Sequence, residues 1–313
     1  MFLTPGFKGF VNLSNQGLLS VKGPDAQTFL QGQVTCDLNI LNNSFSTLGA
    51  HCTHKGRMLF SFRACSIDSD TIGLNIFEPL LEDALAALKK YSIFSKVDLI
   101  NANQNYHLVG YIGTDTSDLI SLFPQLKSQA LPQGQALHSD NGTLIKMTNS
   151  RYECWLTTEA FDDLSSTIEM ADSSTWTAFN IIDGIGDIRP ETVEMFIPQM
   201  LNFQSIEQAI SFNKGCYTGQ EVVARMQYLG KLKRHMYRFS TPEESPLQPG
   251  TPIYSPDKKQ SIGNIVISSI VDDQQQLLAV VTEEAVKADL VYLDQDCHKK
   301  LQVLTLPYAI TKE

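Results

Sequence analysis

The sequence has little basic charge and no long apolar run. Its 24 lysines and arginines stand against 34 aspartates and glutamates, which leaves a formal net charge of −10. A chain this acidic lacks the general cationic surface that neutralises nucleic-acid phosphates, so we expect no direct nucleic-acid binding. No uncharged apolar stretch approaches the ~20 residues that span a bilayer, so we expect no membrane insertion.

Paired cysteines and a signal peptide are also missing. The six cysteines are scattered and form no CxxC pair, which favours neither a disulfide framework nor a zinc site. The run His51-Cys52-Thr53-His54 does not change this, because in a strand only Cys52 and His54 share a face. The first residues lack a basic start and a continuous apolar core. We therefore expect a cytoplasmic protein with free thiols and no metal. Without a coiled coil or an apolar docking stripe, we expect a monomer.

The chain alternates strand-like and helix-like segments before residue 190. Strands are predicted at 17–22, 57–67, 71–77, 106–112 and 152–157, and helices at 24–30, 79–91, 158–170 and 175–184. Asp172, Ser173 and Ser174 precede the last helix as capping candidates. From about residue 233, short strands between Pro/Gly turns are predicted at 235–240, 251–254, 262–270, 277–282, 290–293 and 301–306. This pattern of helices and strands predicts an α+β protein that ends in a small β-barrel or sandwich.

The segment KGCYTGQE, from Lys214 to Glu221, is the most informative in the chain. Thr218 and Glu221 match the T-x-x-E capping box, which predicts that a helix begins there. Cys216 would then lie just before the amino end of a helix, two residues from Lys214, and both features favour a thiolate. From the residues alone, Cys216 is either a reactive thiol or an inert cysteine.

The same segment carries a family resemblance. Residues 212–225, FNKGCYTGQEVVAR, resemble the signature of the YgfZ family, relatives of the glycine-cleavage T-protein that include a mitochondrial iron–sulfur assembly factor. Around Cys216, the signature residues are Lys214, Gly215, Tyr217, Thr218, Gly219, Gln220 and Glu221. Further matching segments follow along the chain: QGQVT at 31–35, AHC-x-x-KG at 50–56, KKY-x-x-FSKV at 89–97, FIPQ at 196–199 and LPY at 306–308.

The resemblance implies a T-protein-like folate-binding α+β fold, with two related α/β domains around a central channel and a C-terminal β-barrel. We expect the first domain at 1–50 with 148–230, the second at 51–147 and the barrel at 231–313. The resemblance also implies tetrahydrofolate, or another folate, as the ligand. It further implies a role in supporting iron–sulfur enzymes or their assembly machinery, including enzymes that thiolate tRNA.

Individual folate contacts follow from the resemblance less directly. Trp176 matches a tryptophan that the family uses for folate, although core packing is the alternative for a tryptophan on an apolar helix face. The family's second tryptophan falls at Gln16. The Glu that relatives carry after this helix aligns with Ile182. Either Asp183 substitutes for it or the contact is absent.

Three functions remain in view. A folate-dependent aminomethyltransferase would need an acid beside the folate nitrogen. Phe60 and Ser61 occupy the positions of the T-protein acid pair, so this reaction is disfavoured. The favoured alternative is a folate-binding accessory protein in which Cys216 performs redox, thiol or transient cluster chemistry. In the third, folate is only a structural ligand and Cys216 marks a partner interface.

Overall fold

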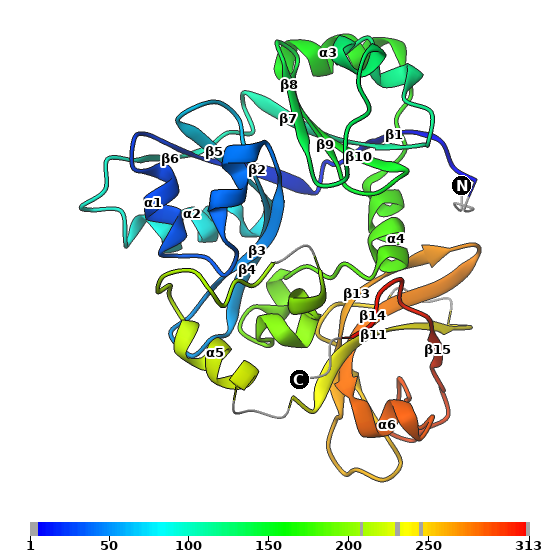
Figure 1. Ribbon diagram of the computed structural model, residues 1–313. Helices are drawn as coiled ribbons and strands as arrows, with labels where there is room; N and C mark the ends of the chain where they lie inside the picture. The colour runs from blue at the N-terminus through cyan, green and yellow to red at the C-terminus, as the bar shows by residue number, and fades with distance from the viewer. Residues whose placement is uncertain (1–5, 207–208, 229–231, 244–246, 311–313) are drawn as a thin grey trace.

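The computed structural model describes residues 6–206, 209–228, 232–243 and 247–310. Its strands form three five-stranded sheets, and the longer helices pack on or between them (Figure 1). The fold is thus the mixed α/β arrangement that the sequence predicts. No helix within the described ranges is long and apolar enough to cross a membrane.

The first sheet has the strand order β3-β4-β5-β2-β6. Its strands are β2 (Gln16–Lys22), β3 (Thr47–Cys52), β4 (Met58–Ser66), β5 (Thr71–Phe77) and β6 (Asp98–Asn101). The helices α1 (Ala26–Gln31) and α2 (Leu81–Lys89) bury Phe29, Leu81 and Leu88 in the same core as the sheet. The short turns η1 (Leu38–Asn43) and η2 (Glu78–Leu80) complete this part. The strands predicted at 57–67 and 71–77 and the helix at 79–91 are confirmed.

The second sheet has the order β1-β7-β10-β9-β8. Its strands are β1 (Gly9–Asn12), β7 (Tyr106–Ile112), β8 (Ala136–Ser139), β9 (Gly142–Lys146) and β10 (Arg151–Thr157), with the turns η3 (Ser117–Leu119) and η4 (Pro124–Lys127) between β7 and β8. The helices α3 (Thr158–Thr167) and α4 (Ser173–Asp183) follow. The predicted cap of α4 is confirmed, because the Asp172 carboxylate accepts a 2.8 Å bond from the backbone N–H of Ser174.

The third sheet curls into a half-barrel at the C-terminal end of the chain. Its strands are β11 (Arg234–Thr241), β12 (Pro252–Ile253), β13 (Gly263–Val271), β14 (Gln274–Thr282) and β15 (Gln302–Leu304), in the order β12-β13-β14-β11-β15, with α6 (Glu283–Lys287) after β14. The strand predicted at 290–293 is wrong, since Tyr292 makes only isolated bridges to Tyr254 and Lys300. The helix α4 lies between the second and third sheets (Figure 1).

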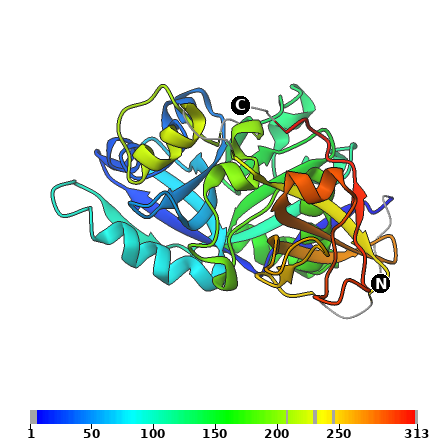
Figure 2. The same cartoon turned by 90° about the horizontal axis from the view of Figure 1, so that it is seen from below.

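The segment between α4 and the third sheet is made of short turns. It contains η5 (Pro190–Thr192), η6 (Pro198–Leu201), η7 (Phe203–Ser205) and the helix α5 (Gln220–Tyr228). Figure 2 shows this segment crossing between the first sheet and the half-barrel. The third sheet begins at Arg234, near the predicted boundary at 231, whereas β3 and β2 share a sheet with strands beyond residue 50. The predicted domain division itself stays a prediction.

Candidate functional site

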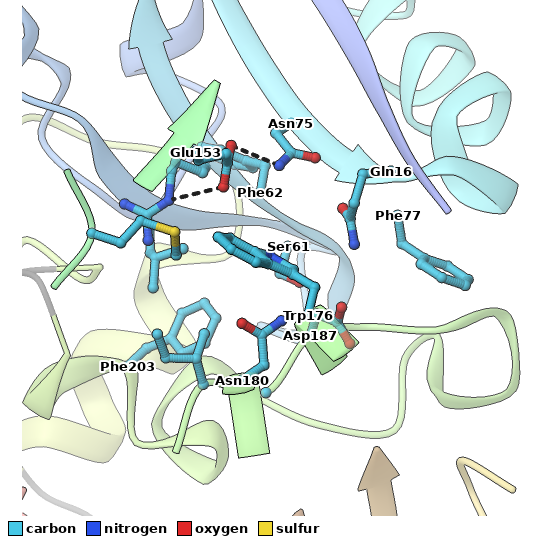
Figure 3. Close-up of a pocket in the computed structure, with 15 residues that line it drawn as sticks. Gln16, Ser61, Phe62, Asn75, Phe77, Glu153, Trp176, Asn180, Asp187 and Phe203 are labelled. Atoms are coloured by element: carbon cyan, nitrogen blue, oxygen red, sulfur yellow. Dashed lines mark hydrogen bonds and ion pairs between the residues drawn. The ribbon is translucent and has the colours of Figure 1, made fainter. Parts of the chain in front are cut away.

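A narrow slot lies where the first two sheets meet α4 and the segment that follows it (Figure 3). The space measures about 500 Å³ counting its open mouth, of which about 60 Å³ accepts the centre of a water molecule. Its lining comes from parts of the chain that lie far apart in sequence: Gln16, Leu48, Ser61, Phe62, Arg63, Asn75, Phe77, Met147, Glu153, Trp176, Asn180, Ile185, Gly186, Asp187 and Phe203. The structure therefore brings the two predicted folate positions, Gln16 and Trp176, to one cavity.

Trp176 is held in this wall by close packing. Its side chain is 4% exposed. The Arg151 guanidinium lies 4.0 Å from the ring centroid, and a Cβ added at Gly110 of β7 would lie 2.5 Å from the ring. Trp176 is thus a core residue, and its buried indole also forms part of the cavity wall, while its contact with folate stays a prediction.

The sequence raised Asp183 as a substitute for the family's acid, but its carboxylate has another partner. Arg151 is buried and donates to Asp183 Oδ2 at 2.5 Å and to Asn180 Oδ1 at 2.8 Å. Burial lowers the pKa of Arg151, and the Asp183 charge opposes that shift. Neither Ile182 nor Asp183 lines the slot. Asp183 therefore supports Arg151 behind Trp176.

One acid that does reach the slot is Glu153 of β10, which the sequence patterns did not single out. It is 2% exposed and accepts hydrogen bonds from Asn75 Nδ2 at 2.8 Å and from Trp155 Nε1 at 2.7 Å. Arg63 of β4 lies 3.7 Å from its second oxygen and is itself 3% exposed. The available signal was a charged residue among the apolar residues of each strand, since buried charges are rare.

The slot also holds an unsatisfied acceptor. Asn75 donates its amide N–H to Glu153, while its buried Oδ1 has no hydrogen-bond partner. A buried polar atom without a partner is costly, and one in a cavity indicates a ligand or water that the cavity receives. In Figure 3, Asn75 and Glu153 lie above Trp176, and Asn180 lies below Trp176.

The positions of the T-protein acid pair have different roles here. Phe60 is 1% exposed and belongs to the main core. Ser61 lines the slot, and its Oγ accepts a 2.9 Å bond from the backbone N–H of Ile188. A second slot carboxylate, Asp187, is bound by Arg189 at 2.7 and 2.9 Å. Phe60 and Ser61 therefore supply no acid to the slot.

The signature segment forms a separate site. Cys216 is exposed and does not line the slot, whereas Cys36, Cys52, Cys65 and Cys154 are buried. Burial raises the pKa of the Cys36 thiol to about 12. Gly215 has open space where a side chain would project. Cys216 is accordingly the most accessible of the six thiols.

The predicted capping box is wrong in its geometry. The helix α5 begins at Gln220, followed by Glu221, and the Thr218 hydroxyl donates instead to Gln33 Oε1 at 3.2 Å. Gly219 precedes the helix with a φ of +85°, and a Cβ there would lie 2.5 Å from the carbonyl oxygen of Thr53. Thr218 and Gly219 thus fasten the segment to the first sheet and its turns.

Lys214 has a similar fastening role. Its ammonium donates to the carbonyl oxygens of Val34 and Cys36, both at 2.7 Å, and lies 5.1 Å from the Tyr217 ring centroid. Burial lowers the pKa of Lys214 to about 8. Tyr217 is 6% exposed, and its buried hydroxyl has no hydrogen-bond partner. Because Lys214 is committed to two carbonyls, its charge is directed at the backbone of residues 34–36.

No group of three or more His, Cys, Asp or Glu side chains in the described ranges is placed to hold a metal ion. In the run His51-Cys52-Thr53-His54, the His51 ring lies 2.8 Å from the Gln33 carbonyl oxygen, and Cys52 is buried. Burial lowers the pKa of His51, which favours the neutral ring.

Comparisons with known proteins agree with this architecture. No protein-family model matches the chain. The glycine cleavage system aminomethyltransferase T from Bartonella henselae has a similar fold, with a TM-score of 0.71 at 14% identity over 97% of this chain and 87% of that one. The tRNA-modifying protein YgfZ of Klebsiella pneumoniae is 31% identical over 309 residues, 96% of this chain and 93% of that protein. Its namesake in Vibrio atlanticus is 30% identical over 325 residues, again 96% and 93%. With such identity over nearly the whole length, the chain belongs to the YgfZ family.

Proposed function

We propose that this protein binds tetrahydrofolate in the slot. In this proposal it is an accessory protein for iron–sulfur enzymes, including tRNA-modifying ones, and acts through Cys216. The observation that carries the folate part is the slot itself, where Trp176 and Gln16 meet the buried acceptors of Glu153 and Asn75. The name of the relatives, tRNA-modifying protein, supports the connection to tRNA modification.

The polar groups of the slot match the chemistry of a pterin. The amino-pyrimidinone edge of a reduced pterin presents N–H donors, which need acceptors in a buried site. Glu153 supplies a carboxylate, and Asn75 supplies the unsatisfied Oδ1. These two residues would hold the pterin edge, and Trp176 would form one wall. Tetrahydrofolate supplies a carrier for one-carbon units when it is bound.

The slot must widen to admit a pterin ring. About 60 Å³ for water centres holds only a few waters, which is too little for a bicyclic ring. Phe77 also borders a larger groove of about 1050 Å³ counting its open side, lined on one side by Arg189 and Thr177 and on the other by Ser268 and Ser269. This groove has room for the aminobenzoyl-glutamate part of a folate, and Arg189, whose guanidinium pairs with Asp187, borders it.

An accessory role fits the site better than aminomethyl transfer. Phe60 and Ser61 supply no acid, and the carboxylates that do line the slot, Glu153 and Asp187, are each bound to an arginine or an amide. Such groups recognise a ligand but are poorly placed to manage the charge of a reacting amine. The exposed thiol of Cys216 lies outside the slot and is free for separate chemistry.

Calorimetric titration with tetrahydrofolate tests the ligand. We expect saturable binding by the wild type and weaker binding by Trp176→Ala, while Phe94→Ala, a change at a fully exposed aromatic, serves as the control. Absence of wild-type binding would sink the folate assignment. Unchanged affinity in Trp176→Ala would remove only that contact.

Complementation of a deletion strain tests the thiol. We expect Cys216→Ser to leave tRNA thiolation defective and Cys297→Ser, at the other cysteine that is not buried, to restore it. Full rescue by Cys216→Ser would show that the thiol has no chemical role, and Cys216 would then mark a partner interface.

A further inference from the structure

A bare apolar loop projects between α2 and β6. Of the six large hydrophobic side chains that are exposed in the described part of the chain, four lie at Tyr91, Ile93, Phe94 and Ile100. Phe94 is 99% exposed and Ile93 is 77% exposed. Figure 1 shows this cyan loop at the left edge of the molecule, away from the other sheets, and Figure 2 shows it projecting at the same edge.

The loop is built to present these side chains. Its backbone closes a turn through a 2.9 Å bond from Ser95 N–H to the Ser92 carbonyl. The Lys96 N–H donates to Asp25 Oδ2 at 2.8 Å, and a Cβ at Gly23 would lie 2.2 Å from the Lys96 carbonyl oxygen. A loop fixed at its base loses little conformational entropy on binding, which favours association.

The charge of the loop differs from that of the chain. Residues 89–96 contain Lys89, Lys90 and Lys96 and no acid, in a protein of net charge −10. Large exposed apolar side chains beside one sign of charge are typical of protein interfaces in which the partner carries the opposite charge. The chemistry that complements the loop is an apolar pocket bordered by carboxylates.

Other occupants fit less well. A symmetric pair of copies would place each lysine cluster against the same cluster of the other copy. An RNA partner would meet a chain of net charge −10 with only three local cations. A membrane surface would need a wider apolar face than these four side chains offer, since Phe94 is 99% exposed, Ile93 is 77% exposed, and Tyr91 and Ile100 are about half buried.

The loop is also linked to the signature segment. The Tyr91 ring centroid lies 6.2 Å from that of His51, and the His51 ring contacts the Gln33 carbonyl at 2.8 Å. Gln33 Oε1 in turn accepts the Thr218 hydroxyl. Tyr91, at the start of the loop, is therefore connected to the signature segment through these contacts.

We propose that residues 89–96 form a docking surface for a protein partner, with Phe94 and Ile93 inserted into an apolar pocket and the three lysines paired with carboxylates on its rim. The surface does not depend on folate binding. It assigns a function to the KKY-x-x-FSKV run that neither the slot nor Cys216 uses.

Photo-crosslinking from p-benzoylphenylalanine at position 94, in cells, identifies the partner, with the same group at Val303 of β15 as the position control. The protein crosslinked only from position 94 is then purified and titrated calorimetrically with the full chain. We expect Phe94→Ser to weaken binding about tenfold or more. Replacement of Lys89, Lys90 and Lys96 by glutamate should also weaken it, and added salt should weaken binding of the wild type.

Correct folding of each variant is checked independently by its unfolding midpoint and its tetrahydrofolate titration, both of which should match the wild type. The proposal is overturned if the purified protein binds wild type and Phe94→Ser equally, or if the lysine replacements do not weaken binding. It is also overturned if position 94 crosslinks only to RNA, lipid or a second copy, or no differently from position 303.

Discussion

The Gly110→Ala variant tests whether the position of Trp176 matters for the ligand. The added methyl group would lie 2.5 Å from two ring carbons of Trp176, closer than any real contact, so the indole must move. It cannot move freely, because the Arg151 guanidinium lies 4.0 Å from the ring centroid. Overpacking of this kind costs about 1–3 kcal/mol of unfolding free energy. The displaced ring should also lose its contact with the pterin. The binding free energy of tetrahydrofolate would then weaken by about 0.5–1.5 kcal/mol, which is about a tenfold loss of affinity at most.

The chain offers a control in Gly9→Ala. Gly9 of β1 has a φ of +143°, a backbone conformation that alanine adopts only with strain, and neither Gly9 nor the neighbouring Phe7 lines the slot. Chemical denaturation should show similar destabilisation in both variants, whereas calorimetry should show weakened tetrahydrofolate binding only for Gly110→Ala. Equal affinity in Gly110→Ala and the wild type would refute the role of the Trp176 wall. Equal loss in both variants would show that general loosening is responsible.

Three further predictions follow from other contacts. Gln16→Trp places the family's second tryptophan at the slot, so tetrahydrofolate should bind up to about tenfold more tightly by calorimetry, and unchanged or weaker binding contradicts this. The pKa of Lys214 is lowered from 10.5 to about 8, so between these pH values the unfolded chain keeps a proton that the folded chain has released. The unfolding free energy of the wild type should therefore rise with pH relative to Lys214→Met, and a constant difference in urea melts argues against it. Asp183→Asn leaves Arg151 buried without its counter-charge and should cost about 3–5 kcal/mol. Asp289→Asn, at an exposed pair with Lys300, should cost under about 1 kcal/mol, and similar losses in the two variants would be the contrary result.

Local patterns predicted the elements but not the long-range contacts. Alternating apolar residues located β4, β5, β7 and β10, and the Asp172 cap located the start of α4, because these signals lie within a few residues of the chain. The T-x-x-E pattern failed at Thr218, since the helix begins two residues later at Gln220 and the Thr218 hydroxyl donates to Gln33, 185 positions away in sequence. A capping pattern contains no information about such a distant contact.

Prediction of the slot residues from the sequence was limited for the same reason. The family resemblance led to Trp176 and Gln16, which do line one slot, yet it gave no sign of Glu153, because the family's acid aligns with Ile182. Arg63 and Glu153 come from strands of different sheets and meet only in three dimensions. Only the presence of a charge among apolar strand residues pointed to either residue.

The buried Arg63–Glu153 pair has a consequence for how the slot works. Burying two charges is costly, and replacing such a pair with apolar residues is often neutral or stabilising. The two side chains are 3% and 2% exposed, so stability alone gives little reason to keep them. Their position in the slot, beside the unsatisfied Asn75 Oδ1, gives a reason, because a ligand with N–H donors would complete the network. The slot is therefore polar beside Asn75, and the chain has no acid at 60 and 61, the positions that the family resemblance assigns to the T-protein acid pair. We infer that the slot is built for recognition of its ligand, while the accessible thiol of Cys216 stands outside it.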